Sequence, residues 1–92
     1  MIVRVLGEGQ LEVGDDVLDH LNTLDDAVEA AVESGDEAAF REALDGLLRA
    51  VREHGRPLPD DALVPSDAIL PAPDVPLAQV RDLLGDEGLI PG

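Results

Sequence analysis

The sequence predicts an α+β fold, in which an N-terminal antiparallel β-hairpin packs on a two-helix hairpin. Three observations predict it. A β-branched, apolar run opens the chain within residues 1–13, two stretches with helical apolar spacing fill residues 15–55, and prolines concentrate in residues 56–76. A short C-terminal helix and tail over residues 76–92 complete the predicted core. With 92 residues the chain has the length of one small domain, which we take as residues 1–92.

The first 13 residues have the pattern of a hairpin with a glycine turn. The run Ile2–Leu6 is apolar on both faces apart from Arg4, as a central strand would be. Residues 10–13 alternate polar and apolar side chains, as a half-exposed strand does. Gly7 and Gly9 lie between the two runs and favour a tight turn.

Residues 15–55 predict two amphipathic helices joined by a short turn. Apolar residues recur at three- and four-residue spacing in each helix, which places them on one stripe. Gly35 suits a left-handed residue after the first helix, and Asp36 suits the N-cap of the second. We expect Gly55 to end the second helix as Gly35 ends the first. So short a turn makes the helices antiparallel. The residues expected in the core are Leu21, Leu24, Val28, Phe40, Leu44, Leu47 and Val51.

Gly46 breaks the expected composition of the second helix. It lies on the face opposite the apolar stripe and costs roughly 1 kcal/mol relative to alanine. Close approach of another element is the one explanation that we offer for it.

Residues 56–76 contain six of the seven prolines, which excludes a helix there. Apolar residues stand between the prolines, so we expect this Pro-rich wrap (residues 56–76) to cover the core. Ala68–Leu70 is its candidate third strand, at an edge of the sheet. Pro76 suits the first position of the last helix, and Gly85 its end. The residues of that helix expected to face inward are Leu77, Val80, Leu83 and Leu84.

Composition excludes several functions. The formal net charge is −15, from 21 acidic residues against six arginines and no lysine. Such acidity argues against binding nucleic acid, whose phosphates need cationic partners, and against anionic membrane surfaces. It favours a basic protein partner. No run approaches the roughly 20 apolar residues of a membrane span, and no signal peptide is evident. We therefore expect a cytoplasmic protein with no direct membrane insertion.

The first predicted helix has an acidic outer face without a single arginine. Its acids are Asp15, Asp16, Asp19, Asp25, Asp26, Glu29 and Glu33. Glu33 lies at the negative end of the helix dipole, where stability alone would favour a cation. Two interpretations stay open: a solvated face, or a docking face for a basic helix. The residues that would contact such a partner are Asp19, Asp26, Glu29 and Glu33. The second candidate surface is apolar and includes Leu89 and Ile90.

The sequence contains no strong motif for catalysis, metal binding or nucleotide binding. His20 and His54 should be neighbours in an antiparallel helix pair, but two histidines without further ligand spacing do not predict a metal site. Gly7 and Gly9 begin a dinucleotide-binding pattern, yet Glu12 stands where its third glycine belongs. Neither a nucleophile beside a histidine nor a calcium loop is present in the sequence. We expect no catalytic residue, no cofactor and no enzyme activity.

Both ends of the chain carry a family resemblance. The opening segment Met1–Gln10, the closing segment Leu84–Gly92, Pro65-Ser66-Asp67 and the helical hairpin together resemble the phage-shock-protein-A-associated (PspAA) domain family. The resemblance covers essentially the whole chain. It implies a small cytoplasmic protein encoded beside a phage-shock protein A homologue, which is a membrane-remodelling coiled coil of the envelope stress response. It supplies no catalytic residues.

Two functions follow from these observations. In the first, the protein is a non-enzymatic accessory or adaptor of the phage-shock response that binds a phage-shock protein A-like coiled-coil protein. That partner would recruit it to the inner membrane face. In the alternative, the protein is an acidic inhibitor or mimic that occupies the nucleic-acid site of a basic protein. Self-association into a homo-oligomer stays open.

Overall fold

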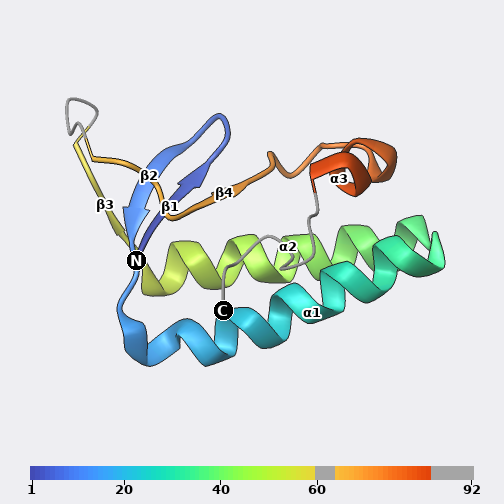
Figure 1. Ribbon diagram of the computed structural model, residues 1–92, viewed down its shortest axis with the longest axis horizontal. Helices are drawn as coiled ribbons and strands as arrows, with labels where there is room; N and C mark the ends of the chain where they lie inside the picture. The colour runs from blue at the N-terminus through green and yellow to red at the C-terminus, as the bar shows by residue number, and fades with distance from the viewer. Residues whose placement is uncertain (60–63, 84–92) are drawn as a thin grey trace.

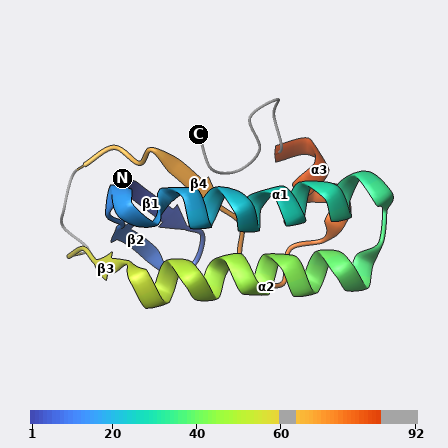
Figure 2. The ribbon, with the colours of Figure 1, turned by 90° about the horizontal axis from the view of Figure 1, so that it is seen from below.

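The structure is a computed structural model that describes residues 1–59 and 64–83, with the side chains of residues 81–83 left out. Two long antiparallel helices form one layer, and a mixed sheet and a short helix cover the same side of that layer (Figure 1 and Figure 2). The predicted α+β class is confirmed. The elements in order are β1 (Ile2–Val5), β2 (Gly9–Glu12), the 3₁₀ turn η1 (Asp15–Val17), α1 (Leu18–Ser34), α2 (Glu37–His54), β3 (Arg56–Pro57), β4 (Ala68–Leu70) and α3 (Leu77–Leu83).

The sheet has the strand order β3-β2-β1-β4, so β1 is central, as its two-faced apolar pattern predicts. β1 pairs antiparallel with β2 and parallel with β4, and Val3 stands opposite both Leu11 and Ala68. The predicted third strand is therefore confirmed at residues 68–70. The two-residue strand β3, which pairs antiparallel with β2, was not predicted.

Glycines make the hairpin turn and the turn between the long helices. Gly7 and Gly9 have φ angles of 87° and 107°, which other residues rarely adopt. Gly35 ends α1 in the left-handed region, and its N–H donates to the carbonyls of Ala31 and Val32. Asp36 caps α2, because its carboxylate accepts a hydrogen bond of 3.1 Å from the backbone N–H of Ala39. These predictions are confirmed.

Gly55 ends α2 as predicted, but the expectation that it does so in the conformation of Gly35 is wrong. Its backbone is extended, with φ −86° and ψ 154°, because the chain runs directly from α2 into β3. Glycine is required for a different reason, which is close packing. A Cβ at this position would lie 2.5 Å from the carbonyl oxygen of Val51 and 3.0 Å from the Cβ of Leu11.

The core lies between the helix pair and the inner face of the sheet. The sheet contributes the inward side chains of β1, β2 and β4, and six of the seven predicted helical residues are buried against them. Leu24 is the exception and is only partly buried. Leu77 and Val80 of α3 are also buried, as predicted, while Leu84 and Gly85 lie outside the described residues. Pro76 stands one residue before α3, and its carbonyl accepts from the N–H of Val80.

Polar contacts attach the Pro-rich wrap to the hairpin. The backbone N–H of Ile2 donates to the Asp67 carboxylate, and the backbone N–H of Asp67 donates to the carbonyl of Ile2, both at 2.8 Å. The Gln10 side-chain amide donates to the carbonyl of Val64 at 2.9 Å and to Ser66 Oγ at 2.8 Å. These contacts hold the chain in place immediately before it enters β4.

The buried stripe of α2 allows a first test. We expect Leu44→Ala to lower the free energy of unfolding by about 2–4 kcal/mol, because it leaves a cavity in the core. Chemical denaturation followed by circular dichroism measures the change. An unchanged midpoint would show that Leu44 is not packed as the structure places it.

Gly46 allows a second test. Beyond its own turn of α2, a Cβ at Gly46 would meet no atom of the described residues within 4 Å, so the interpretation of close approach by another element is wrong for this part of the chain. Replacing it with alanine should therefore raise the free energy of unfolding by roughly 1 kcal/mol through helix propensity alone. A lower melting temperature for Gly46→Ala would reveal an undetected steric constraint.

Candidate functional site

Three of the predicted partner-binding acids form one row along α1. Asp19, Asp26 and Glu33 are seven residues apart, so they recur after two helical turns on the exposed side of the helix. Glu29 lies beside this line of three side chains and is half-buried. We call these four residues the acidic row. Within residues 1–59 and 64–80, none of the four makes an ion pair, and the three ion pairs found there are Arg49–Asp45, Arg52–Glu8 and Arg56–Glu12.

The electrostatics of the acidic row are unfavourable in the isolated domain. Burial raises the pKa of the Glu29 carboxyl above its ordinary value, and the neighbouring charges of Asp25, Glu33 and Asp26 raise it further. The folded chain therefore resists ionising Glu29. An arrangement selected only for the stability of the free domain would have placed a cation here.

Asp25 does not belong to the exposed face, although the sequence interpretation counted it with the outer acids. Its side chain is only 3% exposed. Leu21, Asp25, Val28 and Val32 follow the three- and four-residue spacing of the buried stripe, so the signal for its burial was present in the sequence. A partner that docks on α1 cannot reach it directly.

A groove between the two long helices borders the acidic row. It encloses about 510 Å³ near the turn that joins α1 to α2, and small side chains line it. Sequence reasoning missed it, because helical periodicity identifies the buried stripe but not the seam between two helices. The lining residues are Ala27, Ala30, Ala31, Ser34, Ala39, Glu42 and Ala43.

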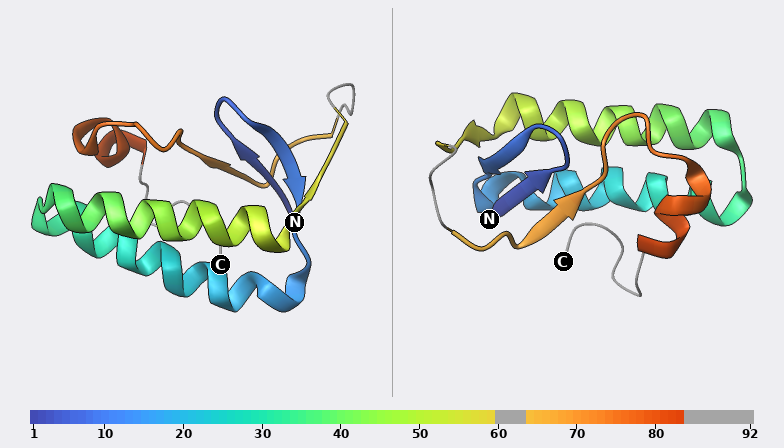
Figure 3. Two further views of the ribbon diagram at one scale, coloured as in Figure 1. Left: turned by 180° about the vertical axis from the view of Figure 1, so that it is seen from behind. Right: turned by 90° about the horizontal axis from the view of Figure 1, so that it is seen from above.

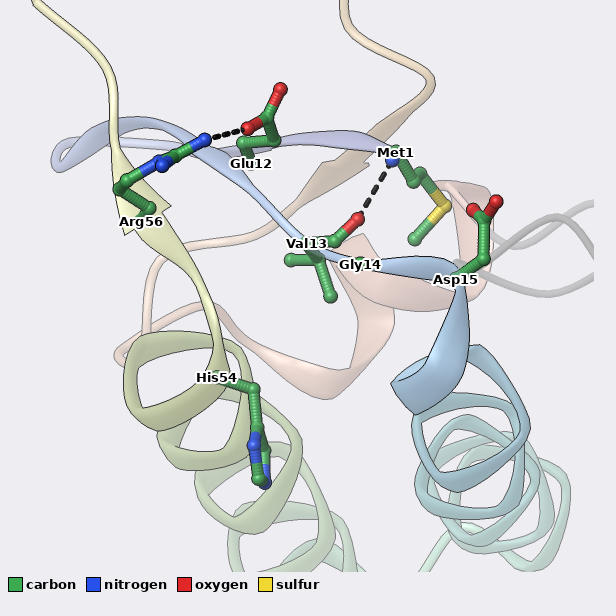
Figure 4. Close-up of a pocket in the computed structure, with 7 residues that line it drawn as sticks. All are labelled: Met1, Glu12, Val13, Gly14, Asp15, His54 and Arg56. Carbon is green, nitrogen blue, oxygen red and sulfur yellow. Dashed lines mark hydrogen bonds and ion pairs between the residues drawn. The ribbon is translucent and has the colours of Figure 1, made fainter.

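The opposite end of the helix pair has a second hollow of about 420 Å³ (Figure 4). Three of its charged groups already have partners: the Met1 ammonium donates to the carbonyl of Val13 at 2.8 Å, and Arg56 pairs with Glu12. None of the seven lining side chains carries a hydroxyl or a thiol, so the hollow offers no nucleophile of the usual kind. The lining residues are Met1, Glu12, Val13, Gly14, Asp15, His54 and Arg56.

His20 and His54 are neighbours, as the antiparallel arrangement predicts. Their rings meet edge-on, with 6.1 Å between centroids. Within the part of the chain that the structure describes, no group of three or more potential ligands could hold a metal ion. The remaining predicted contact residues, Leu89 and Ile90, lie outside the described residues.

Comparison with known proteins assigns the family. A family model described as PspA-Associated protein matches residues 1–92. The chain belongs to the PspA-associated protein family. No curated protein and no solved structure matches the chain. In this PspA-associated protein, none of the described helices combines the length and apolarity that a membrane crossing requires.

The raised pKa of Glu29 predicts a pH-dependent effect on stability. Because the folded state binds this proton more tightly than the unfolded chain does, ionised Glu29 destabilises the fold, and protonation removes that cost. We expect Glu29→Gln to raise the melting temperature at pH 7. This advantage should fade as the pH falls through the raised pKa of Glu29 and be absent below 4.5, the ordinary pKa of the group. Glu53→Gln on α2 is the matched control. No gain at neutral pH would contradict the unfavourable electrostatics of the row.

Proposed function

We propose that this protein is a non-enzymatic adaptor of the phage-shock, or envelope stress, response. In this proposal it binds a PspA homologue, a coiled-coil protein, through the outer face of α1. The observation that supports the proposal most directly is the acidic row, whose members make no ion pair with any side chain that the structure describes and whose mutual repulsion disfavours the free domain. Membership of the PspA-associated family supports the identity of the partner.

The spacing of the row suits a helical partner. Asp19, Asp26 and Glu33 recur every seven residues, which is about 10.5 Å along α1. Coiled-coil helices repeat their surface residues with the same period of seven. A line of arginines or lysines at one heptad position of the partner would therefore meet successive members of the row. The alanine-lined groove beside the row leaves room for the partner backbone to approach closely.

The alternative, an acidic mimic that occupies a nucleic-acid site, has less support. Charges along one DNA strand repeat every 3.4 Å of helix axis, a much finer spacing than the roughly 10.5 Å of the row. A mimic would be expected to follow the finer spacing. We therefore retain the adaptor as the proposed function.

The adaptor proposal also places the protein in the cell. Anionic lipid headgroups repel a chain with a net charge of −15, so direct membrane contact is disfavoured. We propose that the protein is cytoplasmic and reaches the inner membrane face only through its coiled-coil partner.

Charge reversal tests the proposed interface. We expect Glu29→Lys combined with Glu33→Lys to weaken binding of a PspA homologue by roughly tenfold or more at low salt, mainly through slower association. Titration calorimetry measures the affinity, and raising the salt should weaken the unaltered complex because the Debye length is about 10 Å at 0.1 M. Glu53→Lys combined with Asp74→Lys is the matched control, because it changes the net charge by the same amount at positions outside α1.

One outcome would reject the acidic-row interface. If the correctly folded double variant bound the PspA homologue as tightly as the unaltered protein, the row would not be the contact. The predicted apolar surface that includes Leu89 and Ile90 would then be the next candidate.

A further inference from the structure

The sheet has a second face, which the helix pair does not cover. Val3 and Val5 point into the core, so the alternate residues of β1 and its continuation, Ile2, Arg4 and Leu6, point away from the helices. Ile69 of β4 stands beside Arg4 on this outward face. None of the described helices packs over it, and α3 lies toward the far end of the helix pair (Figure 3).

The outward face is unusually apolar for this protein. Leu6 is 43% exposed and Ile69 is 56% exposed, and Val64 is the only other large apolar residue of the described chain that is comparably exposed. Contiguous exposed apolar side chains of this kind mark interaction surfaces more often than scattered ones do. We call the surface formed by Ile2, Arg4, Leu6 and Ile69 the outer patch.

Arg4 lies in the middle of the outer patch and makes no hydrogen bond or ion pair with the described part of the chain. Every other arginine whose side chain the structure describes is engaged: Arg41 donates to the carbonyl of Pro73, and the other three pair with Asp45, Glu8 and Glu12. The cross-strand neighbours of Arg4 are Gln10 and Ile69. The Gln10 amide is already committed to Val64 and Ser66, and neither of these two cross-strand neighbours is an acid.

We propose that the outer patch binds an amphipathic helix of a partner protein, and that this helix carries a carboxylate between two apolar residues. The guanidinium of Arg4 presents a planar set of donors that matches a carboxylate. Ile2 and Leu6 on one side and Ile69 on the other supply apolar contacts around that ion pair. Partial exclusion of water by these side chains strengthens the pairing.

The dimensions favour a helix as the occupant. Ile2 and Leu6 are four strand residues apart, or about 13 Å, with Arg4 midway. Eight residues of a helix span about 12 Å, so apolar residues at i and i+8 with an acid at i+4 match the outer patch. On β2 the residue opposite Arg4 is Gln10, which is buried and bonded to Val64 and Ser66, so the helix would lie along β1 and β4.

A second copy of this chain fits the outer patch less well. Two-fold pairing through the same surface would bring Arg4 toward Arg4 of the other copy, and like charges oppose that contact. A strand added to the free edge of β4 would use backbone hydrogen bonds and would leave Arg4 unpaired. Both occupants remain outcomes that the experiment can detect.

The sheet and α1 lie in different layers (Figure 1), and the outer patch and the acidic row are on the sides of these elements that face away from the core, so both could be occupied at once. The row suits a basic helix, whereas the patch suits an acidic and apolar one. An adaptor with two such surfaces joins two different segments, either of one partner or of two. The inference does not depend on the proposed function, because it uses other residues and the opposite charge.

The test uses a labelled synthetic helical peptide of about 18 residues, with leucines at i and i+8, glutamate at i+4, and alanine and glutamine elsewhere. Fluorescence anisotropy measures its binding to the full chain. We expect one peptide per chain, and we expect Arg4→Gln to weaken binding by roughly tenfold through loss of the charge-assisted hydrogen bonds. Replacing the peptide glutamate with glutamine should have the same effect, with little further loss when both changes are combined.

A charge swap and a matched control complete the design. Arg4→Glu should restore binding to a peptide that carries lysine at i+4. Arg49→Gln, which removes an arginine from α2, should leave binding unchanged. Since Arg4 makes no hydrogen bond or ion pair with the residues that the structure describes, Arg4→Gln should melt at the same temperature as the unaltered protein, which separates loss of binding from loss of folding.

Four outcomes would overturn the inference. They are no peptide binding, equal binding by Arg4→Gln, chemical shift changes that map to the alanine-lined groove or the β4 edge, and self-association of the chain through Ile69. None of them bears on the adaptor proposal, because Glu29→Lys combined with Glu33→Lys should retain binding of this acidic peptide.

Discussion

The rest of the structure depends on the burial of two helical stripes by one narrow sheet. α1 and α2 lie side by side, and their apolar stripes cover more width than a two-stranded hairpin can. β1 must therefore have a neighbour on each side. The hairpin turn supplies β2 locally, but the strand on the other side, β4, comes from beyond both helices. Residues 65 positions apart, Ile2 and Asp67, must meet before the core can close. The prolines of the returning segment, residues 56–76, restrict the unfolded chain. Ordering this segment therefore costs less conformational entropy.

Polar contacts make that distant pairing specific. A strand of three residues makes few backbone hydrogen bonds with its neighbour, so its register needs other support. Asp67 supplies this support, because its carboxylate accepts from the N–H of Ile2 and its own N–H donates to the carbonyl of Ile2. The side-chain amide of Gln10 donates to Val64 and Ser66 and so holds the residues just before Asp67. Two of the segments that carry the family resemblance, Met1–Gln10 and Pro65-Ser66-Asp67, are therefore in direct contact. Their shared role is to place β4 beside β1, which explains them structurally without invoking catalysis.

Local rules identified most of the fold, and long-range geometry decided the rest. Gly35 and Asp36 were predictable because helix ends depend on a few neighbouring residues. Ala68–Leu70 was predictable because an apolar triplet stands out among prolines. β3, by contrast, exists only because Gly55 brings the chain against Leu11, and no pattern within residues 56–57 indicates this. For the candidate site, periodicity found the acidic row, whereas the isolation of Arg4 depends on which side chains stand next to it in the sheet.

The distribution of charge separates what the fold needs from what it does not. Among the described side chains, three arginines pair with acids that lie off α1, which leaves the acidic row uncompensated on one side and Arg4 without an ion pair on the other. Exposed ion pairs are each worth only about 0–1 kcal/mol, so leaving these groups unpaired costs the domain little. The same groups gain more when a partner excludes water from them. A small domain with modest stability can therefore keep two oppositely charged surfaces open for binding, provided that its core and its strand register are secured elsewhere. Gln10, Asp67 and the buried helical stripes provide that security, and none of them belongs to either surface.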